Sequence, residues 1–391
     1  MANNTIKAKV GFLFFISTGI QTNKPLDMME KKIAGCTASA DVKPMKDFKI
    51  AEDFLMSGGG KFPHKRYHVP ASKLVLPDTL SENTHVILTD FYDAGVLEVA
   101  VNASLEVNSV DTLIYLRQIF MAPVAVTEDG LSIAQMADRI IAPLGFTTAG
   151  AEFSYLVEIN EYLGKTDIND IFENDKNALY GIMTGDEGYE FLAPDLADMR
   201  LSSAWSSREF IKTIIFNNNF LLLNLTNIER IAQYHERQNQ FGGKFHGGAN
   251  PYFFLNADSA CLNHGVLFSI EVGMIAKSIS ASVLERQVSK ANTRKWMVGR
   301  EIKRAKELRK DLILTLNRLE NVGINEMDEL DHLIVEGLDV DPLVEKIKYL
   351  LELLESELDL LYQTSTNALV NILTIIGLLL TIIGMVVPLF S

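Results

Sequence analysis

The sequence predicts an α+β region followed by a long helical hairpin and stalk and then by one C-terminal transmembrane helix. Three observations support this. Residues 8 to about 265 alternate between short strand-like and helix-like segments. Beyond residue 265 the pattern becomes almost continuously helical, with no proline between 267 and 321. Near the C-terminus, the uncharged run from Ala368 to Phe390 is long enough to cross a bilayer as a helix.

The composition excludes several classes of protein. A chain of 391 residues with 48% hydrophobic residues can bury a sizeable core, and its length suggests two or three units. With 36 basic and 50 acidic residues the net charge is −14, so direct nucleic-acid binding through a broadly positive surface is not expected. Cys36 and Cys261 are isolated, which predicts neither a disulfide framework nor a zinc site.

The first predicted domain, residues 1–265, is an α+β domain with a mixed sheet, either whole or divided into two subdomains. The apolar run Val10–Ile16 is interpreted as a buried strand and not as a signal peptide, which predicts a cytoplasmic domain. The predicted strands are Lys9–Ser17, His85–Phe91, Val96–Val107, Phe153–Ile159, Leu179–Thr184, Glu190–Leu192 and Phe210–Leu225, the last divided near Asn217–Asn219. The predicted helices are Val110–Met121, Ser132–Ile141, Ile168–Glu173 and Asn227–Gln238. Turn residues at Tyr92–Gly95 and Gly185–Gly188 predict hairpins.

Residues 266–341 are expected to form a helical hairpin arm whose tip is acidic. A run without a basic residue predicts either a solvated tip or a loose divalent-cation sensor; it contains Glu326, Asp328, Glu329, Asp331, Glu336, Asp339 and Asp341. Asp341 followed by Pro342 then predicts a helix start. From there one helix is expected to run as a cytoplasmic stalk, 342–367, and a transmembrane helix, 368–390, until Pro388 interrupts the helical pattern.

The stalk carries an apolar seam, spaced by three and four residues, that predicts packing along a partner helix. Its residues are Leu343, Ile347, Leu350, Leu354, Leu358 and Leu361. The partner is either the preceding helix, in an antiparallel hairpin, or another copy of the stalk. A basic run at 303–310 would lie opposite the acidic residues Glu352, Glu355, Glu357 and Asp359, and this favours the hairpin.

Polar residues in the apolar tail share one helical face. Projection at about 100° per residue places six residues within about 40° of one line. They are Asn367, Asn371, Thr374, Leu378, Thr381 and Met385. Gly377 and Gly384 fall on the neighbouring face, where small residues allow close helix packing. The pattern predicts a pore-lining stripe with the acidic residues at its mouth, or a simple anchor whose threonine hydroxyls bond to their own helix.

At this point the sequence resembles the CorA-type divalent-cation transporters. The resemblance lies in the architecture, in Asn371–Ile376 at the start of the membrane helix, and in Gly384-Met385, where the family has Gly-Met-Asn. In that family these helices form a pentameric pore whose signature Asn selects magnesium, so the resemblance implies a pentameric ring of tail helices, and the ion stays open without that Asn. The third signature position here is Val386, and no second transmembrane helix follows in this sequence. CorA-like membrane effectors of phage defence, including those of type III CRISPR systems, are similar in lacking the signature.

Two glycine-rich basic segments predict anion binding, for instance of a nucleotide-like ligand. The first contains Lys61, Lys65 and Arg66, and the second contains Lys244 and His246. Neither matches a Walker A loop, and a flexible solvated loop is the alternative in both cases. No catalytic motif is present, and the Asp186-Glu187 pair lies in a predicted turn, so an enzyme is not expected.

Together these patterns predict a homo-oligomeric protein that is anchored by its tail in the inner or plasma membrane, with membrane lipids as partners. Its tail helices would form a pore or a membrane-perturbing ring gated by the cytoplasmic domain. No cofactor is expected apart from a divalent cation such as magnesium or a nucleotide-like ligand. The alternatives are a tail-anchored scaffold without transport and a membrane-tethered enzyme.

Overall fold

The structure is a computed structural model of the chain. It describes residues 5–17, 31–32, 43–44, 64–77, 84–91, 96–145, 152–201, 204–208, 210–225, several positions within 266–278, 306, 313 and 328–386, with backbone alone for 379–386 and for some other positions within the helices and strands. The chain divides into two compact units. The first contains Met1–Ile279 and Asn321–Asp341, and the second contains Ser280–Glu320 and Pro342–Ser391.

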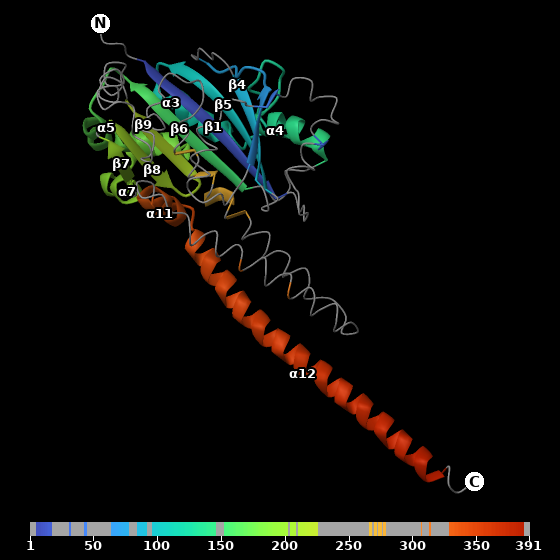
Figure 1. Ribbon diagram of the computed structural model, residues 1–391. Coiled ribbons are helices and arrows are strands. Elements are labelled where there is room, and N and C mark those ends of the chain that lie inside the picture. Colours follow the sequence, from blue (N-terminus) through green and yellow to red (C-terminus); the bar gives the residue numbers. More distant parts are fainter. Residues whose placement is uncertain are drawn as a thin grey trace, which may run out of the picture. The chain divides into compact units, whose positions relative to one another are not determined.

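A nine-stranded sheet forms the centre of the first unit, in the order β2-β3-β4-β5-β1-β6-β9-β8-β7 (Figure 1). All neighbouring strands are antiparallel except β6 and β9, which are parallel, so the predicted mixed sheet is confirmed. The strands are β1 (Ile6–Ser17), β2 (Lys43–Pro44), β3 (His64–Pro70), β4 (Thr84–Phe91), β5 (Val96–Val107), β6 (Glu152–Tyr162), β7 (Ala204–Arg208), β8 (Ile211–Phe216) and β9 (Asn219–Asn224).

Helices follow the strands in the first unit, and several begin with side-chain caps. They are α3 (Val110–Ile119), α4 (Ile133–Ile141), η2 (Ala142–Leu144), α5 (Ile168–Asn174), α6 (Lys176–Thr184), η3 (Tyr189–Phe191), α7 (Pro194–Arg200) and α11 (Asp328–Gly337). Ser132 caps α4 by accepting a hydrogen bond from the Gln135 backbone, and the Gln135 side chain accepts one from the Ser132 backbone in return. This capping box explains why α4 starts where it does.

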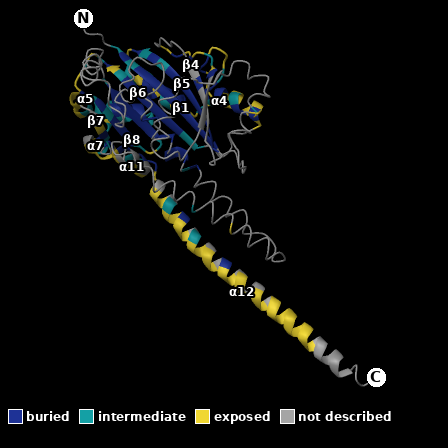
Figure 2. Ribbon diagram, viewed as in Figure 1, coloured by how far each residue is buried: buried dark blue, intermediate teal, exposed yellow. Residues whose placement is uncertain are grey.

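The main hydrophobic core lies on one face of the sheet. Alternate residues of β1, including Phe12 and Phe14, are completely buried there and pack against side chains of α3, α4 and α6. The Phe120 ring at the end of α3 stacks on Phe12, with 5.2 Å between the ring centroids. Figure 2 shows the central strands in the dark blue of buried residues. Burial in this core explains why the apolar pattern of the central strands is easy to recognise in the sequence.

The opposite face of the sheet is buried as well. Leu13 and Phe15 of β1 are fully buried on that side. Helix α11 packs on β7 and β8, with Leu330 and Ile334 buried. Burial on both faces explains why β9 reads as a continuous apolar run in the sequence.

Most of the predicted elements are confirmed. The predicted strand Val96–Val107 is β5, and the other confirmed strands are β1, β4, β6, β8 and β9, with bounds that differ by a few residues. Strands β4 and β5, on either side of the predicted hairpin turn, pair antiparallel, and the turn residues Tyr92–Gly95 themselves lie outside the described residues. Helices α3, α4 and α5 are also confirmed. The predicted helix Asn227–Gln238 lies outside the described residues.

Three predictions between 179 and 192 are wrong. Leu179–Thr184 belongs to helix α6, because Leu179, Ile182 and Met183 are buried at helical and not at alternating spacing. Glu190–Leu192 is mostly the short helix η3. The predicted hairpin at Gly185–Gly188 is the end of α6, where Gly185 has φ of 78° and closes the helix in the left-handed conformation.

Part of the acidic run lies in a helix of the first unit. Asp328–Gly337 forms helix α11, and Asn321–Asp341 belongs to the first compact unit together with the sheet. The apolar residues Leu330, Ile334 and Leu338 are at most 1% exposed. Burial of these side chains holds α11 on the sheet, and the neighbouring charges make this apolar face hard to recognise in the sequence. The unit boundaries therefore differ from the expected arm at 266–341.

Helix α12 runs without interruption over Val340–Val386, and all of it from Pro342 onward belongs to the second unit. The predicted continuity of stalk and tail in one helix is therefore present, although the helix begins two residues before Pro342 and the expected cap at Asp341 lies in its first turn. Of the predicted seam, Ile347 and Leu358 are 0% and 7% exposed. Their burial supports packing along a partner segment.

Candidate functional site

The tail half of α12 presents large apolar side chains that are about half exposed. Their exposed fractions range from 47% at Ile376 to 61% at Leu378. The others are Leu369, Val370, Ile372, Leu373 and Ile375. Figure 2 shows this part of α12 in the yellow of exposed residues. A continuous apolar surface on a helix is typical of an interaction with lipid or with other protein chains.

The predicted polar stripe lies on this helix. Asn367, Asn371, Thr374 and Leu378 are exposed. Thr381, Gly384 and Met385 are helical, but their side chains lie outside the described residues. Because one α-helix carries all of them, the projection that groups these positions on adjacent faces applies.

The threonine hydroxyls in the described part of the tail bond to their own helix. The Thr374 Oγ1 donates to the Val370 carbonyl over 2.8 Å, and the Thr366 Oγ1 donates to the Tyr362 carbonyl over 2.8 Å. Such bonds satisfy the hydroxyl donor within one chain. This is the arrangement expected for an anchor, and the oxygen lone pairs remain able to face water or an ion.

Gly377 leaves space on the face of α12 next to the polar stripe. A Cβ built at Gly377 would have no heavy atom of the surrounding chain within 4 Å. A glycine on an apolar helix allows a second helix to approach closely.

The acidic residues predicted at the pore mouth lie on the surface of α12. Glu352, Glu355 and Asp359 are exposed, while the side chain of Glu357 is outside the described residues. The basic residue Lys306 lies near this segment, with its Nζ 5.6 Å from the centroid of the Tyr362 ring. This contact brings one residue of the predicted basic run beside α12.

Among the described residues, no helix is long and apolar enough to cross a membrane. The expected transmembrane helix, 368–390, extends past Leu378, the last residue of α12 whose side chain is described.

The two basic segments do not come together as a site in the described structure. Lys65 and Arg66 belong to strand β3, so this part of the first segment is not a loop. Lys61, Lys244 and His246 lie outside the described residues. No cluster of three His, Cys, Asp or Glu side chains that could hold a metal occurs among the positions that the structure describes.

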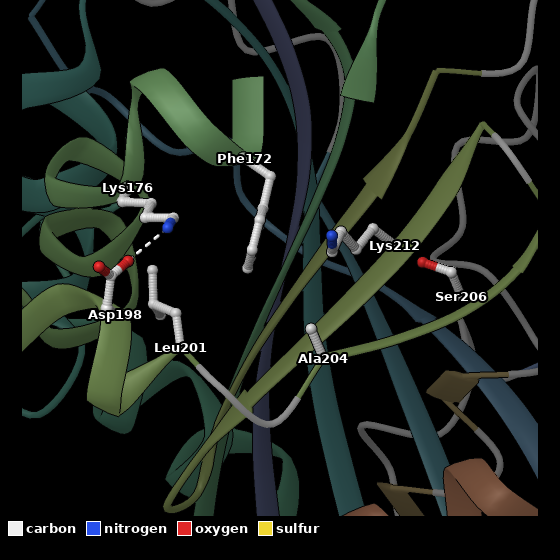
Figure 3. Close-up of a pocket in the computed structure, with 7 residues that line it drawn as sticks. All are labelled: Phe172, Lys176, Asp198, Leu201, Ala204, Ser206 and Lys212. Atoms are coloured by element: carbon white, nitrogen blue, oxygen red, sulfur yellow. Dashed lines mark hydrogen bonds and ion pairs between the residues drawn. The ribbon is translucent and has the colours of Figure 1, made fainter. Parts of the chain in front are cut away.

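A cavity that no sequence motif indicates lies between α5, α6, α7 and the strands β7 and β8 (Figure 3). Its volume is about 310 Å³, and it is lined by Phe172, Lys176, Asp198, Leu201, Ala204, Ser206 and Lys212. The two lysines are far apart in the sequence, and only the fold brings them together. The sequence signal that could have pointed to this cavity is the helix over residues 176–184, which carries Lys176.

Comparison with protein-family models, curated proteins and solved structures finds no match to this chain.

Proposed function

We propose that the protein is a homo-oligomeric, CorA-like membrane protein whose tail helices assemble into a pore or membrane-perturbing ring under the control of its α+β unit. The observation that carries this proposal is the apolar surface of α12 between Leu369 and Leu378, which is about half exposed in the single chain. Leaving such side chains in water is costly, at about 25 cal/mol per Å² of apolar surface. Lipid and neighbouring tail helices provide the missing contacts.

The asparagines favour assembly over a solitary anchor. Asn367 and Asn371 are exposed on the same helix as the apolar residues. An amide side chain within or at the border of hydrocarbon is costly unless water or another helix hydrogen-bonds to it. A ring of tail helices with these asparagines directed inward would provide both water and neighbouring helices as hydrogen-bond partners. The exposed Glu352 and Asp359 would then collect near one mouth of the ring and attract cations.

The experiment is a flux measurement on liposomes that contain the full-length protein. The double variant Thr374→Leu/Thr381→Leu makes the proposed lining more apolar, and we expect it to reduce the flux of monovalent cations at least about tenfold, because apolar constrictions dewet. The control, Ile376→Leu/Ile383→Leu, changes two residues on the opposite side of the helical projection. It should retain the wild-type flux.

Two outcomes would contradict the pore. One is the absence of flux from wild-type liposomes, including those supplied with Mg²⁺ or with nucleotides as candidate ligands. The other is an equal loss of flux in the lining variant and in the control variant. In either case the tail-anchored scaffold becomes the better interpretation, and the hydrogen bond from Thr374 to the Val370 carbonyl already fits it.

A further inference from the structure

The cavity in the α+β unit collects positive charge around an aromatic ring. Figure 3 shows Lys176 and Lys212 directed toward Phe172. The Nζ of Lys212 lies 3.6 Å from the centroid of that ring, and the Nζ of Lys176 lies 5.6 Å from it. Lys176 comes from α6 and Lys212 from β8, so two separate elements hold the ammonium groups beside one ring. Contact with a ring face reduces the freedom of the lysine side chain.

The charges that line the cavity are not balanced. Lys176 forms an ion pair with Asp198, the one carboxylate in the lining. Among the described residues, no carboxylate lies within ion-pair distance of Lys212. Burial lowers the pKa of Lys212, Lys176 lowers it further, and Glu173 opposes the shift. A bound anion would relieve the repulsion between the two ammonium groups.

From this geometry we propose that the cavity binds a small phosphomonoester, with Lys212 as the main contact to the phosphate. Lys212 supplies an ammonium group whose donors are not used by a carboxylate. Lys176 adds a second positive charge, and Ser206 adds a hydroxyl that can donate to a phosphate oxygen. This binding site is independent of the membrane proposal, because all seven lining residues belong to the first unit.

The size and the lining of the cavity restrict the ligand. About 310 Å³ is at the lower end of the range for small-molecule sites, roughly 300–1,000 Å³. Phe172, Leu201 and Ala204 form an apolar wall, and Ser206 is polar, as expected around the uncharged part of a metabolite. A phosphorylated sugar of five or six carbons has the required size and chemistry. Ribose 5-phosphate is therefore a suitable probe, and ribose is its uncharged counterpart.

The test is calorimetric titration of the full-length protein with ribose 5-phosphate, ribose and inorganic phosphate. We expect ribose 5-phosphate to bind, phosphate to bind more weakly, and ribose not to bind. Lys212→Met keeps an apolar side chain against Phe172 but removes the charge, and it should weaken binding at least about tenfold, as expected for a lost charge-assisted hydrogen bond. The control, Lys7→Met, removes the same charge from a lysine that does not line the cavity and should bind like wild type.

A second variant changes the affinity in the opposite direction. Asp198→Asn removes the carboxylate that forms the ion pair with Lys176, which leaves the Lys176 ammonium group available to the phosphate. This variant should therefore bind ribose 5-phosphate several-fold more tightly. A gain in affinity cannot result from partial unfolding, and this variant decides the question if Lys212→Met fails to fold. The proposal is overturned if wild type does not bind ribose 5-phosphate at about 10 mM. It is also overturned if Asp198→Asn binds no more tightly than wild type, or if Lys212→Met and Lys7→Met bind equally well.

Discussion

Two lysines on strand β1 show how burial determines the contribution of an ion pair to the stability of the fold. Lys7 pairs with Glu161 at 2.7 Å, and the two side chains are 45% and 46% exposed. Lys9 pairs with Glu158 at 3.8 Å, and these side chains are only 7% and 0% exposed. Asn160 and Asn224 each donate a side-chain hydrogen bond to the Glu158 carboxylate. The buried carboxylate therefore depends on a fixed set of polar partners.

Replacing Lys9 by Met should destabilise the protein strongly. The change removes the ammonium group beside the buried Glu158 carboxylate, and breaking a buried ion pair from one side costs about 3–5 kcal/mol. Lys7→Met removes the same charge from the same strand and should cost about 0–1 kcal/mol, because its pair is exposed and screened. Urea unfolding followed by the fluorescence of Trp205, which is buried on β7, measures both changes.

The double variant Lys9→Met/Glu158→Leu tests the cause of this loss. It removes both charges, so most of the lost stability should return, although Asn160 and Asn224 lose an acceptor. A Lys9→Met protein as stable as Lys7→Met would contradict the account of the buried pair.

At the residue scale, the sequence predicted the positions that the local pattern specifies and missed those that depend on the fold. Alternation of apolar residues in β1 and β5 identifies both strands from the sequence alone. By contrast, Lys176 and Lys212 lie in different elements, and no spacing rule connects them. Lys9 and Glu158 likewise face each other only through the pairing of β1 with β6.

At the scale of elements, helix α11 shows where charge misled the prediction. Its acidic residues indicate a solvated tip, but its apolar residues are spaced by four and are buried on the sheet. Close approach to β8 depends on Gly337. A Cβ at this position would lie 2.3 Å from the Cγ2 of Ile215, closer than any packed contact.

Gly337→Ala should therefore move α11 away from β8. We expect a loss of about 1–3 kcal/mol, as found for overpacked sites, despite the better helix propensity of alanine. Glu336→Ala, at an exposed neighbouring position of the same helix, is the matched control and should change stability by less than about 0.5 kcal/mol. The same urea titration measures both variants, and equal stabilities would show that α11 does not need this close contact.

Helix α6 was mispredicted for a related reason. A short apolar run followed by Gly185 and Asp186 resembles a strand entering a hairpin, since length and turn residues are the same in both cases. The deciding information is the packing of Leu179 and Ile182 against the core, which is a tertiary contact. In α12 the helical pattern is long enough to be unambiguous, and its continuity was predicted.

For the whole molecule, we propose that the tail of α12 joins several copies of the chain. The apolar side chains around Leu373 are exposed in one chain, and Gly377 leaves room beside them for a second helix. A Cβ at position 377 would meet no atom within 4 Å beyond the helix's own nearby backbone, so a side chain can begin there without a clash. The variant Gly377→Leu would nevertheless prevent a second helix from approaching closely. It should therefore impair assembly and leave the fold of the single chain unchanged.

The most direct measurement is the mass of the full-length protein in lipid nanodiscs, by native mass spectrometry, for wild type and for Gly377→Leu. We predict a closed assembly of more than two identical subunits for wild type. For Gly377→Leu we predict a shift toward smaller species, with unchanged helical circular dichroism. A wild-type protein that is monomeric at every lipid-to-protein ratio would contradict the account.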